Sequence, residues 1–299
     1  NGLEYVTHTE AGTKAGTTGP VTYEVEWNAP PAGAGNVVFY VAGNAANRDG
    51  SVTGDKIYTA SAEYAADSGD TQTKSYALPQ IAFGGEPDPA KGGAGNWKTT
   101  LYFTSTASAA TAFTVDFFGN NGAPMPVPFG GGTAQSIPVS LAAGATTAIE
   151  LKSDAALTQG WASVKLPATV KGFGVFRQDV TGRDPSEAVI PLAEDSKQNY
   201  VMVWDDTAFT TVMAIANPGD TPVTVNLTVR LANGNHIGTG TINLGPKEKS
   251  AFALRTQLNL PAMQGASGAL DISVSSGKLS VLGLRFGPTA VTSMPPAER

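Results

Sequence analysis

Apolar and polar residues alternate along much of this chain of 299 residues, and the alternation limits the folds that it can adopt. From Val223 to Leu231 every odd-numbered residue is Val or Leu, while Thr, Asn or Arg stand between them. The run from Val21 to Trp27 follows a similar pattern. Successive side chains of a strand point to opposite faces of a sheet, so such runs predict strands with one buried and one solvated face. Helical periodicity is hard to find, and the sequence predicts an all-β fold of antiparallel sheets.

The turn residues favour β-sandwiches. Asn121-Gly122 and Asn233-Gly234 each follow an alternating run, and Asn-Gly readily adopts the positive φ angles of a tight hairpin turn. The 35 Gly and 20 Pro residues separate many short runs of this kind. Short strands divided in this way are typical of serial antiparallel β-sandwiches.

An internal repeat relates two long segments of the chain. The segments that recur in the same order are Trp97–Leu101 with Phe209–Met213, Val139–Gly144 with Ile242–Lys247, Gly160–Val164 with Gly268–Ile272, and Gly172–Arg177 with Ser280–Arg285. Recurrence at a near-constant offset indicates tandem copies of one structural unit. We therefore predict two sandwiches of the same kind, at residues 78–193 and 194–299.

The segment before the repeats is short of strands. The strands that we expect in a partial sandwich at residues 1–64 lie near Tyr5–Thr9, Val21–Trp27, Asn36–Ala42 and Ile57–Tyr64. A complete sandwich has about seven strands, so apolar faces and hydrogen-bonding edges stay open. Either preceding residues or a neighbouring molecule must complete this domain. The best candidates for a donated strand are residues 1–20 and a polar linker or arm at residues 65–77, chiefly its part 65–76.

Four stretches of the first segment resemble the C-terminal part of the bacterial choice-of-anchor V domain, which is related to reeler-type sandwiches. These stretches are Tyr5–Thr9, Tyr23–Pro30, Val38–Asn47 and Asp49–Asp55. The repeat pair is similar to immunoglobulin-like modules of long exported bacterial proteins. The resemblances imply a bacterial protein outside the cell or on its surface, built from reeler-like and immunoglobulin-like sandwiches. For the repeat pair they imply architecture only, because one fold serves many functions.

The composition excludes several kinds of chemistry and several partners. The chain has no Cys, which excludes disulfides, thiolate-bound zinc, iron–sulfur clusters and thiol nucleophiles. Only 15% of its residues are charged, against about 25% in an average soluble domain. The net charge of −6 includes no basic stripe, so nucleic acid is not an expected partner. No apolar run approaches the roughly 20 residues of a membrane helix, so no membrane span is expected.

We expect no enzymatic activity from this chain. Its histidines, His8 and His236, do not neighbour a G-x-S-x-G motif that would supply a nucleophile. The carboxylate pairs Glu194-Asp195 and Asp205-Asp206 are adjacent in sequence, so in a strand their side chains would point to opposite faces. These pairs are expected to solvate turns.

One loop combines oxygen-bearing side chains with glycine turns. Within Asn44–Asp55, the candidate ligands for a calcium ion are Asn47, Asp49 and Asp55. Hard cations prefer six to eight oxygen ligands, several of them anionic, and the full EF-hand pattern is missing here. The alternative is a turn in which the Asn and Asp side chains bond to their own loop. No other cofactor is expected.

Trp161 stands on the polar side of an alternating run. Ala162, Val164 and Leu166 form the apolar side, which leaves Trp161 beside Ser163 and Lys165. The repeat has Ala269 at this position, so the sandwich itself does not require a tryptophan. An exposed tryptophan can stack on a sugar or anchor a protein contact, so we predict a binding surface at Trp161, Ser163 and Lys165. The alternative is packing of Trp161 against a neighbouring domain or loop.

Other conspicuous residues are expected to be structural. Trp27, Trp97 and Trp204 lie on or beside apolar faces, which favours the core or a domain junction. Arg177 and Arg285 align in the two repeats, which predicts a structural salt bridge or carbonyl contact for each.

These features predict a non-enzymatic, exported protein with a structural or adhesive role. We expect the subunit of a pilus-like extracellular filament or surface matrix, in which copies of the chain, or other surface proteins, join by β-strand complementation. The alternative is an accessory module of a larger extracellular enzyme or cytochrome. In that case Trp161 would be the leading contact to a polysaccharide.

Overall fold

Strands form almost all of the regular structure, so the prediction of an all-β fold is confirmed. The computed structural model describes residues 6–28, 37–47, 49–51, 53–64, 73–195 and 197–299. These belong to two units, residues 1–69 and 70–299. The helical elements are η1 (Glu10–Thr13), η2 (Pro89–Lys91), α1 (Leu254–Leu258) and η3 (Pro261–Met263). Within the described ranges, no helix has both the length and the apolar character needed to cross a membrane.

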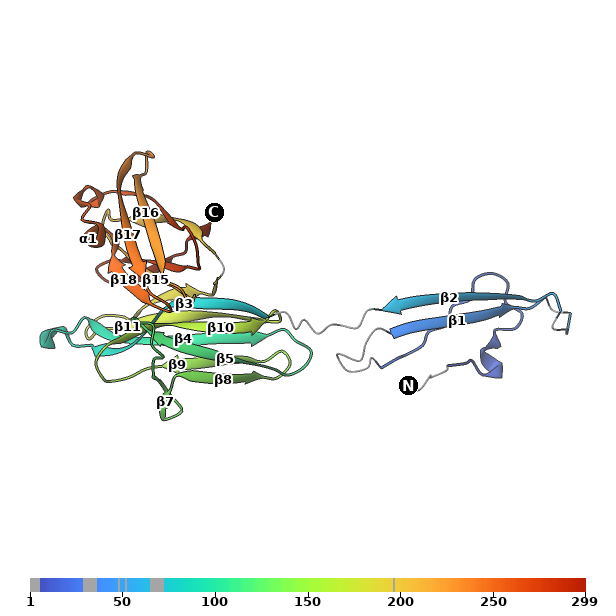
Figure 1. The fold of residues 1–299 in the computed structure, drawn as a ribbon. Coiled ribbons are helices and arrows are strands. Elements are labelled where there is room, and N and C mark those ends of the chain that lie inside the picture. Colours follow the sequence, from blue (N-terminus) through green and yellow to red (C-terminus); the bar gives the residue numbers. More distant parts are fainter. Residues whose placement is uncertain (1–5, 29–36, 48, 52, 65–72, 196) are drawn as a thin grey trace. The chain divides into compact units, whose positions relative to one another are not determined.

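The described residues of the first unit form one antiparallel hairpin. β1 (Val37–Ala45) pairs over its full length with β2 (Lys56–Tyr64), and no third strand of the described residues joins them (Figure 1). The prediction of a strand at Val21–Trp27 is wrong, because this run is irregular. An alternating sequence becomes a strand only where a partner satisfies its backbone groups. Residues 6–9 are also irregular, while Tyr5 and Asn36 lie outside the described residues.

The second unit begins with a sandwich whose sheets are joined. Its strands are β3 (Thr73–Glu86), β4 (Gly95–Ser105), β5 (Thr111–Gly119), β6 (Val127–Phe129), β7 (Gly132–Ala134), β8 (Ser136–Leu141), β9 (Thr146–Leu151), β10 (Thr158–Pro167), β11 (Val170–Asp179), β12 (Ser186–Pro191) and β13 (Ala193–Glu194). Nine of them pair in the order β12-β11-β4-β3-β10-β5-β8, with β9 beside β4 and β13 beside β3, while β6 pairs with β7. The join lies where β3 leaves β10 and pairs with β4. A Cβ on Gly85 would lie 2.4 Å from the oxygen of Gly95, so only glycine permits this approach.

The second sandwich has two separate sheets. Its strands are β14 (Asn199–Asp205), β15 (Thr210–Ala216), β16 (Val223–Leu231), β17 (His236–Leu244), β18 (Lys249–Ala253), β19 (Ser267–Val274), β20 (Ser280–Phe286), β21 (Val291–Met294) and β22 (Ala297–Glu298). One sheet has the order β17-β16-β19-β14-β22, and the other has the order β18-β15-β20-β21. Trp204 is fully buried between them, and its indole N–H donates to the oxygens of Arg230 (3.0 Å) and Ala269 (3.2 Å).

The two sandwiches pair corresponding strands in the same way. β9-β4-β11-β12 corresponds to β18-β15-β20-β21, and β3-β10-β5-β8 corresponds to β14-β19-β16-β17. Buried Leu101 of β4 and buried Met213 of β15 hold equivalent positions, as their aligned sequences predict. In β11 and β20 the structural match differs from the sequence alignment by one residue, because Leu101 is opposite Gly174 whereas Met213 is opposite Gly283.

This one-residue shift corrects the predicted equivalence of Arg177 and Arg285, because a shift by one moves a side chain to the other face of a sheet. The prediction of a structural ion pair for each arginine is nevertheless confirmed. Arg177 pairs with Asp179 (2.9 Å) and Glu187 (3.5 Å). Arg285 pairs with Asp205 at 3.0 Å.

The predicted linker at residues 65–77 is too long. Thr73–Ala77 belong to β3, where Ala77 is fully buried and opposite Ser163 of β10. The small polar residues of this stretch form a strand because β10 supplies their ladder partners. Residues 65–72 lie outside the described residues.

The apolar core of the first sandwich extends onto one face of the second sandwich, which also has a separate core of its own. The residues of the second sandwich that belong to the same buried cluster as the first core are Ala214, Leu282, Leu284 and Val291. β3 lies against β15 and β20, and β12 lies against β21. We call this contact the junction. It explains why residues 70–299 form one unit.

Candidate functional site

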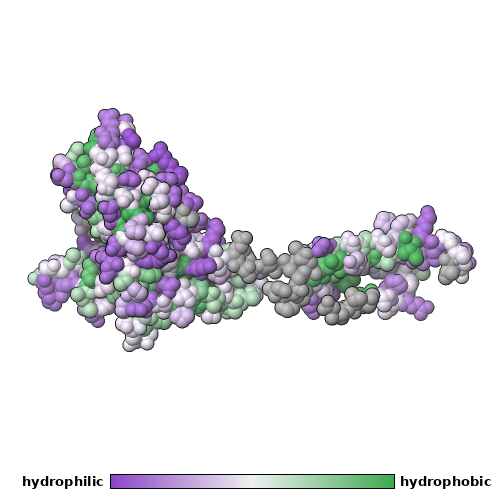
Figure 2. Space-filling view, viewed as in Figure 1, coloured by the Kyte–Doolittle hydropathy of each residue, from purple (hydrophilic) through white to green (hydrophobic). Residues whose placement is uncertain are grey.

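The β1–β2 hairpin carries an apolar face. The residues that its register places on this face are Val37, Phe39 and Val41 of β1 with Tyr58, Ala60, Ala62 and Tyr64 of β2. The exposed fractions of Val41, Tyr58 and Tyr64 are 62%, 61% and 61%. The opposite face also exposes Tyr40 and Ile57, but it is interrupted by polar residues, namely Asn44, Thr59, Ser61 and Glu63. Figure 2 shows hydrophobic surface on this hairpin. The apolar face of a sheet normally packs against a second layer, so this face is suited to contact with another segment.

Trp27 covers part of the apolar face. Its ring meets that of Phe39 edge to face, with centroids 5.1 Å apart. Phe39 meets Tyr64 in the same way at 5.7 Å. Trp27 is still 47% exposed, which corrects the expectation of a core or junction position for this tryptophan. The neighbouring Tyr23 and Val25 are also exposed, so the run Val21–Trp27 combines a strand-like sequence with an accessible apolar side.

The Asn44–Asp55 loop is bonded to itself. Asn47 donates from its side-chain Nδ2 to Asp49 Oδ2 (2.9 Å) and from its backbone N–H to Asp55 Oδ1 (3.0 Å). Asn44 Nδ2 donates to the other oxygen of Asp55 at 3.0 Å. The two bonds that Asp55 accepts lower the pKa of its carboxyl group, and the bond from Asn44 has the larger effect.

The predicted calcium ligands Asn47, Asp49 and Asp55 thus lie together. They bond to one another and to their own loop, as in the alternative of a self-bonded turn. In the part of the chain that the structure describes, no three His, Asp or Glu side chains gather where they could hold a metal ion. These bonds favour the self-bonded turn over the predicted calcium site, and a calcium titration tests the choice.

Trp161 is buried in the junction, which corrects the prediction of an exposed tryptophan. Its exposed fraction is 0%, and it packs with Ala77 of β3 and Ala216 of β15. Phe118 stacks on its ring at a centroid distance of 4.8 Å. The indole N–H donates to the backbone oxygen of Lys247 in the second sandwich at 2.7 Å. The structure confirms the alternative, in which Trp161 packs against a neighbouring domain.

The other two predicted binding residues do not share this burial. Ser163 is half-buried and Lys165 is exposed on the same strand, β10. The surface predicted at these residues is therefore the edge of an intramolecular junction, and its aromatic residue is not accessible to a ligand.

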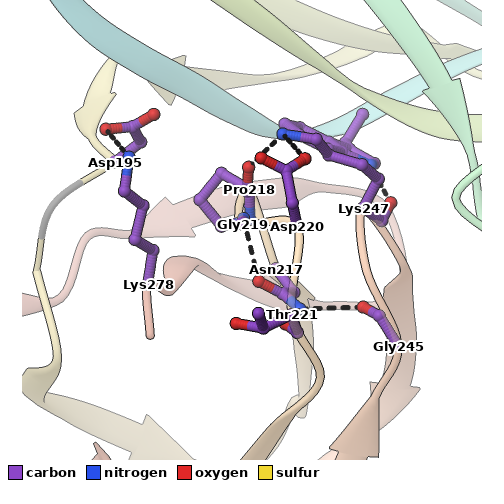
Figure 3. A network of polar contacts seen from close by, with 10 residues as sticks. Asp195, Asn217, Pro218, Gly219, Asp220, Thr221, Gly245, Lys247 and Lys278 are labelled. Carbon is purple, nitrogen blue, oxygen red and sulfur yellow. Dashed lines mark hydrogen bonds and ion pairs between the residues drawn. The ribbon is translucent and has the colours of Figure 1, made fainter. Parts of the chain in front are cut away.

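The loop that receives the Trp161 hydrogen bond is held by a polar network (Figure 3). Lys247 has a left-handed backbone with φ 57°, and its ammonium group reaches Asp220 at 3.1 Å and the oxygen of Pro218. Asn217 is fully buried and its Nδ2 donates to the oxygens of Thr221 and Gly245, each at 2.8 Å. This network fixes the loop that seats against Trp161.

A glycine turn of the first sandwich completes the contact with this loop. A Cβ on Gly122 would lie 2.4 Å from the oxygen of Pro246, so only glycine allows the two loops to touch. The backbone N–H of Lys249 donates to the oxygen of Asn120 at 3.1 Å. The Asn-Gly pair that predicts a hairpin turn therefore also contributes to the junction.

Buried polar groups lie on the junction face of the second sandwich. Lys249 and Ser280 both stand opposite Ala216 in the ladder, which places all three on this face. Among the described residues, Lys249 Nζ and Ser280 Oγ are buried polar atoms without a hydrogen-bond partner. Burial lowers the pKa of Lys249 to about 7.

The two histidines and the carboxylate pairs contact neighbouring side chains and backbone groups. His8 stacks on Tyr23 at a centroid distance of 6.0 Å, and His236 begins β17 in an exposed position. Asp206 is 3% exposed and accepts the backbone N–H of Thr211 at 2.9 Å. Glu194 pairs with Lys74 at 2.9 Å. The expectation that the carboxylate pairs solvate turns is wrong for Asp195 and Asp206, which are only 8% and 3% exposed. Asp195 pairs with Lys278 at 3.5 Å, and Asp206 pairs with Arg255 at 3.4 Å.

Sequence reasoning missed the partners of Trp161. Phe118 was available as a signal, because the register of the aligned repeats puts it beside Trp161 on the same face. Lys247 gave no such signal, since a contact between distant loops depends on how the two sandwiches pack.

Comparison with known proteins adds no relative. No protein-family model, curated protein or solved structure matches this chain.

Proposed function

We propose that this chain is a non-enzymatic subunit of an extracellular filament or surface matrix, assembled when copies exchange β-strands. The observation that carries the proposal is the exposed apolar face of the β1–β2 hairpin at Val41, Tyr58 and Tyr64. An isolated two-stranded hairpin is marginally stable in water and needs a further strand or layer.

The energetic argument favours a macromolecular partner. Burying apolar surface yields about 25 cal/mol per Å², so covering three large side chains contributes several kcal/mol. A strand added along β1 would also pair backbone groups that face solvent at the edge of the hairpin. Both gains come from one partner segment of alternating sequence.

The best donor within the chain is the run Val21–Trp27 of a neighbouring copy. This run has strand alternation, yet it is irregular and its apolar side chains are exposed. Residues 73–76 are excluded as donors because β3 already uses them. A donor and an acceptor at different places make a heterologous contact, which repeats without closing and produces a fibre.

Two further observations support a role outside the cell. The first segment resembles choice-of-anchor V domains, and the chain is poor in charge and free of Cys. The alternative of a polysaccharide-binding accessory module loses its leading contact, because Trp161 is buried.

The test replaces one residue on each face of β1. Val41→Lys places a charge on the apolar face, and Ala42→Lys places the same charge on the other face, where Ala42 is also exposed. We expect the purified parent chain and Ala42→Lys to form polymers in sedimentation velocity and electron microscopy, and Val41→Lys to remain monomeric. A parent chain that stays monomeric at its highest soluble concentration, or equal behaviour of the two variants, would overturn the proposal.

A further inference from the structure

The junction uses one face of the second sandwich, and the first sandwich has the same face exposed. Ala214, Leu282 and Leu284 lie on this face and are no more than 3% exposed, because the first sandwich covers them. The register makes Tyr102 equivalent to Ala214 and Phe173 equivalent to Leu282, since each pair is opposite in its ladder. The rings of Tyr102 and Phe173 stack at 5.3 Å, and Phe173 is 44% exposed.

The other side of the junction also has an uncovered counterpart. In the first sandwich, Phe118 and Trp161 are paired residues that the Lys247 loop covers. In the second sandwich the equivalent pair is Arg230 and Ala269. These two residues line an open cavity of about 350 Å³ together with Val203, which is 64% exposed.

The loops at the junction also have counterparts on the free faces of the two sandwiches. Gly234 corresponds to Gly122, the turn that touches the Lys247 loop, and it also lines the open cavity. Gly144 corresponds to Lys247, and both have left-handed backbones, with φ 67° and 57°. The first sandwich therefore presents, at residues 142–145, a loop of the same backbone form as the one that seats in the junction.

The charges of the two sandwiches are complementary. Residues 73–195, which include the whole first sandwich, hold 8 basic and 10 acidic side chains, a net charge of −2. Residues 196–299 hold 8 basic and 6 acidic side chains, a net charge of +2. A contact between the first sandwich of one copy and the second sandwich of another therefore joins opposite net charges.

We propose that a second copy of this chain docks on the open cavity with its first sandwich, and so repeats the junction between molecules. The 142–145 loop of the incoming copy sits on Ala269, Arg230 and Gly234, and its Tyr102–Phe173 face covers Val203. The proposal rests on the proposed function in that copies assemble, but it uses a surface separate from the hairpin. The contact joins different faces, so it repeats from copy to copy. It is weak on its own and is captured by cross-linking, whereas the hairpin exchange holds the polymer together during sedimentation.

Cysteine cross-linking tests this contact in the full chain, which has no Cys of its own. In the junction Lys249 bonds to Asn120, and the equivalent residues of the free faces are Thr146 and Ala232, both exposed. A chain with Thr146→Cys and Ala232→Cys is expected to give a ladder of oligomers on mild oxidation. The matched control combines Ala232→Cys with Thr133→Cys, which is exposed in the β6–β7 hairpin and has no counterpart in the second sandwich.

Cross-linking in two chains, the parent and Val41→Lys, distinguishes the docking proposal from the hairpin proposal. Each cysteine pair is made in the parent chain and in Val41→Lys, which removes only the hairpin contact. A ladder from the Thr146/Ala232 pair in both backgrounds, at least tenfold above the control pair, supports the docking. A ladder no stronger than the control in the parent overturns it and leaves the hairpin proposal standing. Persistent ladders in both backgrounds with no effect of Val41→Lys on polymer formation overturn the hairpin proposal instead.

Discussion

Thr99 and Thr211 make the same pair of hydrogen bonds in the two sandwiches. The hydroxyl of Thr99 accepts from the N–H of Ala82 at 3.0 Å and donates to its oxygen at 2.8 Å. The hydroxyl of Thr211 accepts from the N–H of Asp205 at 2.9 Å and donates to its oxygen at 3.1 Å. Both threonines are fully buried. Thr99 connects β4 to β3, and Thr211 connects β15 to the end of β14 in the other sheet.

Replacing either threonine by valine tests the importance of this bond pair. Valine has nearly the same shape but leaves a buried N–H and a buried C=O without partners. We expect Thr99→Val and Thr211→Val each to lower the free energy of unfolding by about 1–3 kcal/mol in urea titrations. Thr104→Val, at an exposed position of β4, is the control and should change stability by less than about 0.5 kcal/mol. Neutral effects at both buried sites would show that the bonds are dispensable.

Trp161 offers a test of the junction. Trp161→Ala removes a fully buried ring and is expected to cost about 3–5 kcal/mol of stability. Trp161→Phe keeps most of the packing but leaves the oxygen of Lys247 without its donor, at a cost of about 1 kcal/mol. Lys165→Ala, exposed on the same strand, is the control. If the junction holds the sandwiches together, calorimetry of Trp161→Ala should resolve two transitions, and one unchanged transition would contradict this.

Lys249 should make stability depend on pH. Burial lowers the pKa of its ammonium group from 10.5 to about 7, so between these values the unfolded chain binds more protons than the folded chain. The free energy of unfolding therefore rises as the pH increases from about 7 toward 10. We expect Lys249→Met to be more stable at pH 7, by roughly 1–3 kcal/mol, and to lose most of this rise. Lys152→Met, on an exposed lysine, should behave as the parent, and parallel pH profiles for all three chains would refute the idea.

The fold class could be predicted from the sequence because period-two alternation is a local property. Val223–Leu231 and the Asn233-Gly234 turn form the hairpin of β16 and β17 as the pattern requires. Val21–Trp27 has a similar pattern and no strand, since a strand also needs a partner that the sequence does not specify. The pattern reports which side of a segment is apolar, and packing decides whether that side is used.

Tertiary packing, which the sequence pattern does not show, decides whether the residues of a candidate site are accessible. The repeat shows that the sandwich itself does not require Trp161, since Ala269 stands at the equivalent position. The sequence does not show which surface covers Trp161. The one-residue shift between β11 and β20 was also hidden, because Gly283 and Leu282 are both compatible with the aligned sequences. Only the pairing of whole strands shows which residue faces the junction.

The Asn44–Asp55 loop should not bind calcium strongly. The carboxylates of Asp49 and Asp55 already accept hydrogen bonds from Asn44, Asn47 and Ser51, which a cation would have to displace. Two carboxylates also supply less negative charge than calcium sites usually have. We expect no heat when millimolar calcium is titrated into the chain. A binding isotherm that disappears in Asp55→Asn would establish the site that the sequence suggests.

The donor run Val21–Trp27 can be tested apart from its acceptor. Val25→Lys puts a charge on the apolar side of the run, while Thr22→Lys puts the same charge on its polar side. We expect Val25→Lys to prevent polymer formation and Thr22→Lys to permit it.

Mixing two defective chains gives the decisive measurement on this donor. A Val25→Lys chain keeps an intact hairpin as acceptor, and a Val41→Lys chain keeps an intact donor run. Each should be monomeric alone, whereas an equimolar mixture should form a one-to-one dimer that cannot grow, because it contains one working donor and one working acceptor. Sedimentation of the mixture at increasing concentration distinguishes this dimer from a polymer. If the mixture stays monomeric while the parent chain polymerises, the donated strand lies elsewhere than at Val21–Trp27.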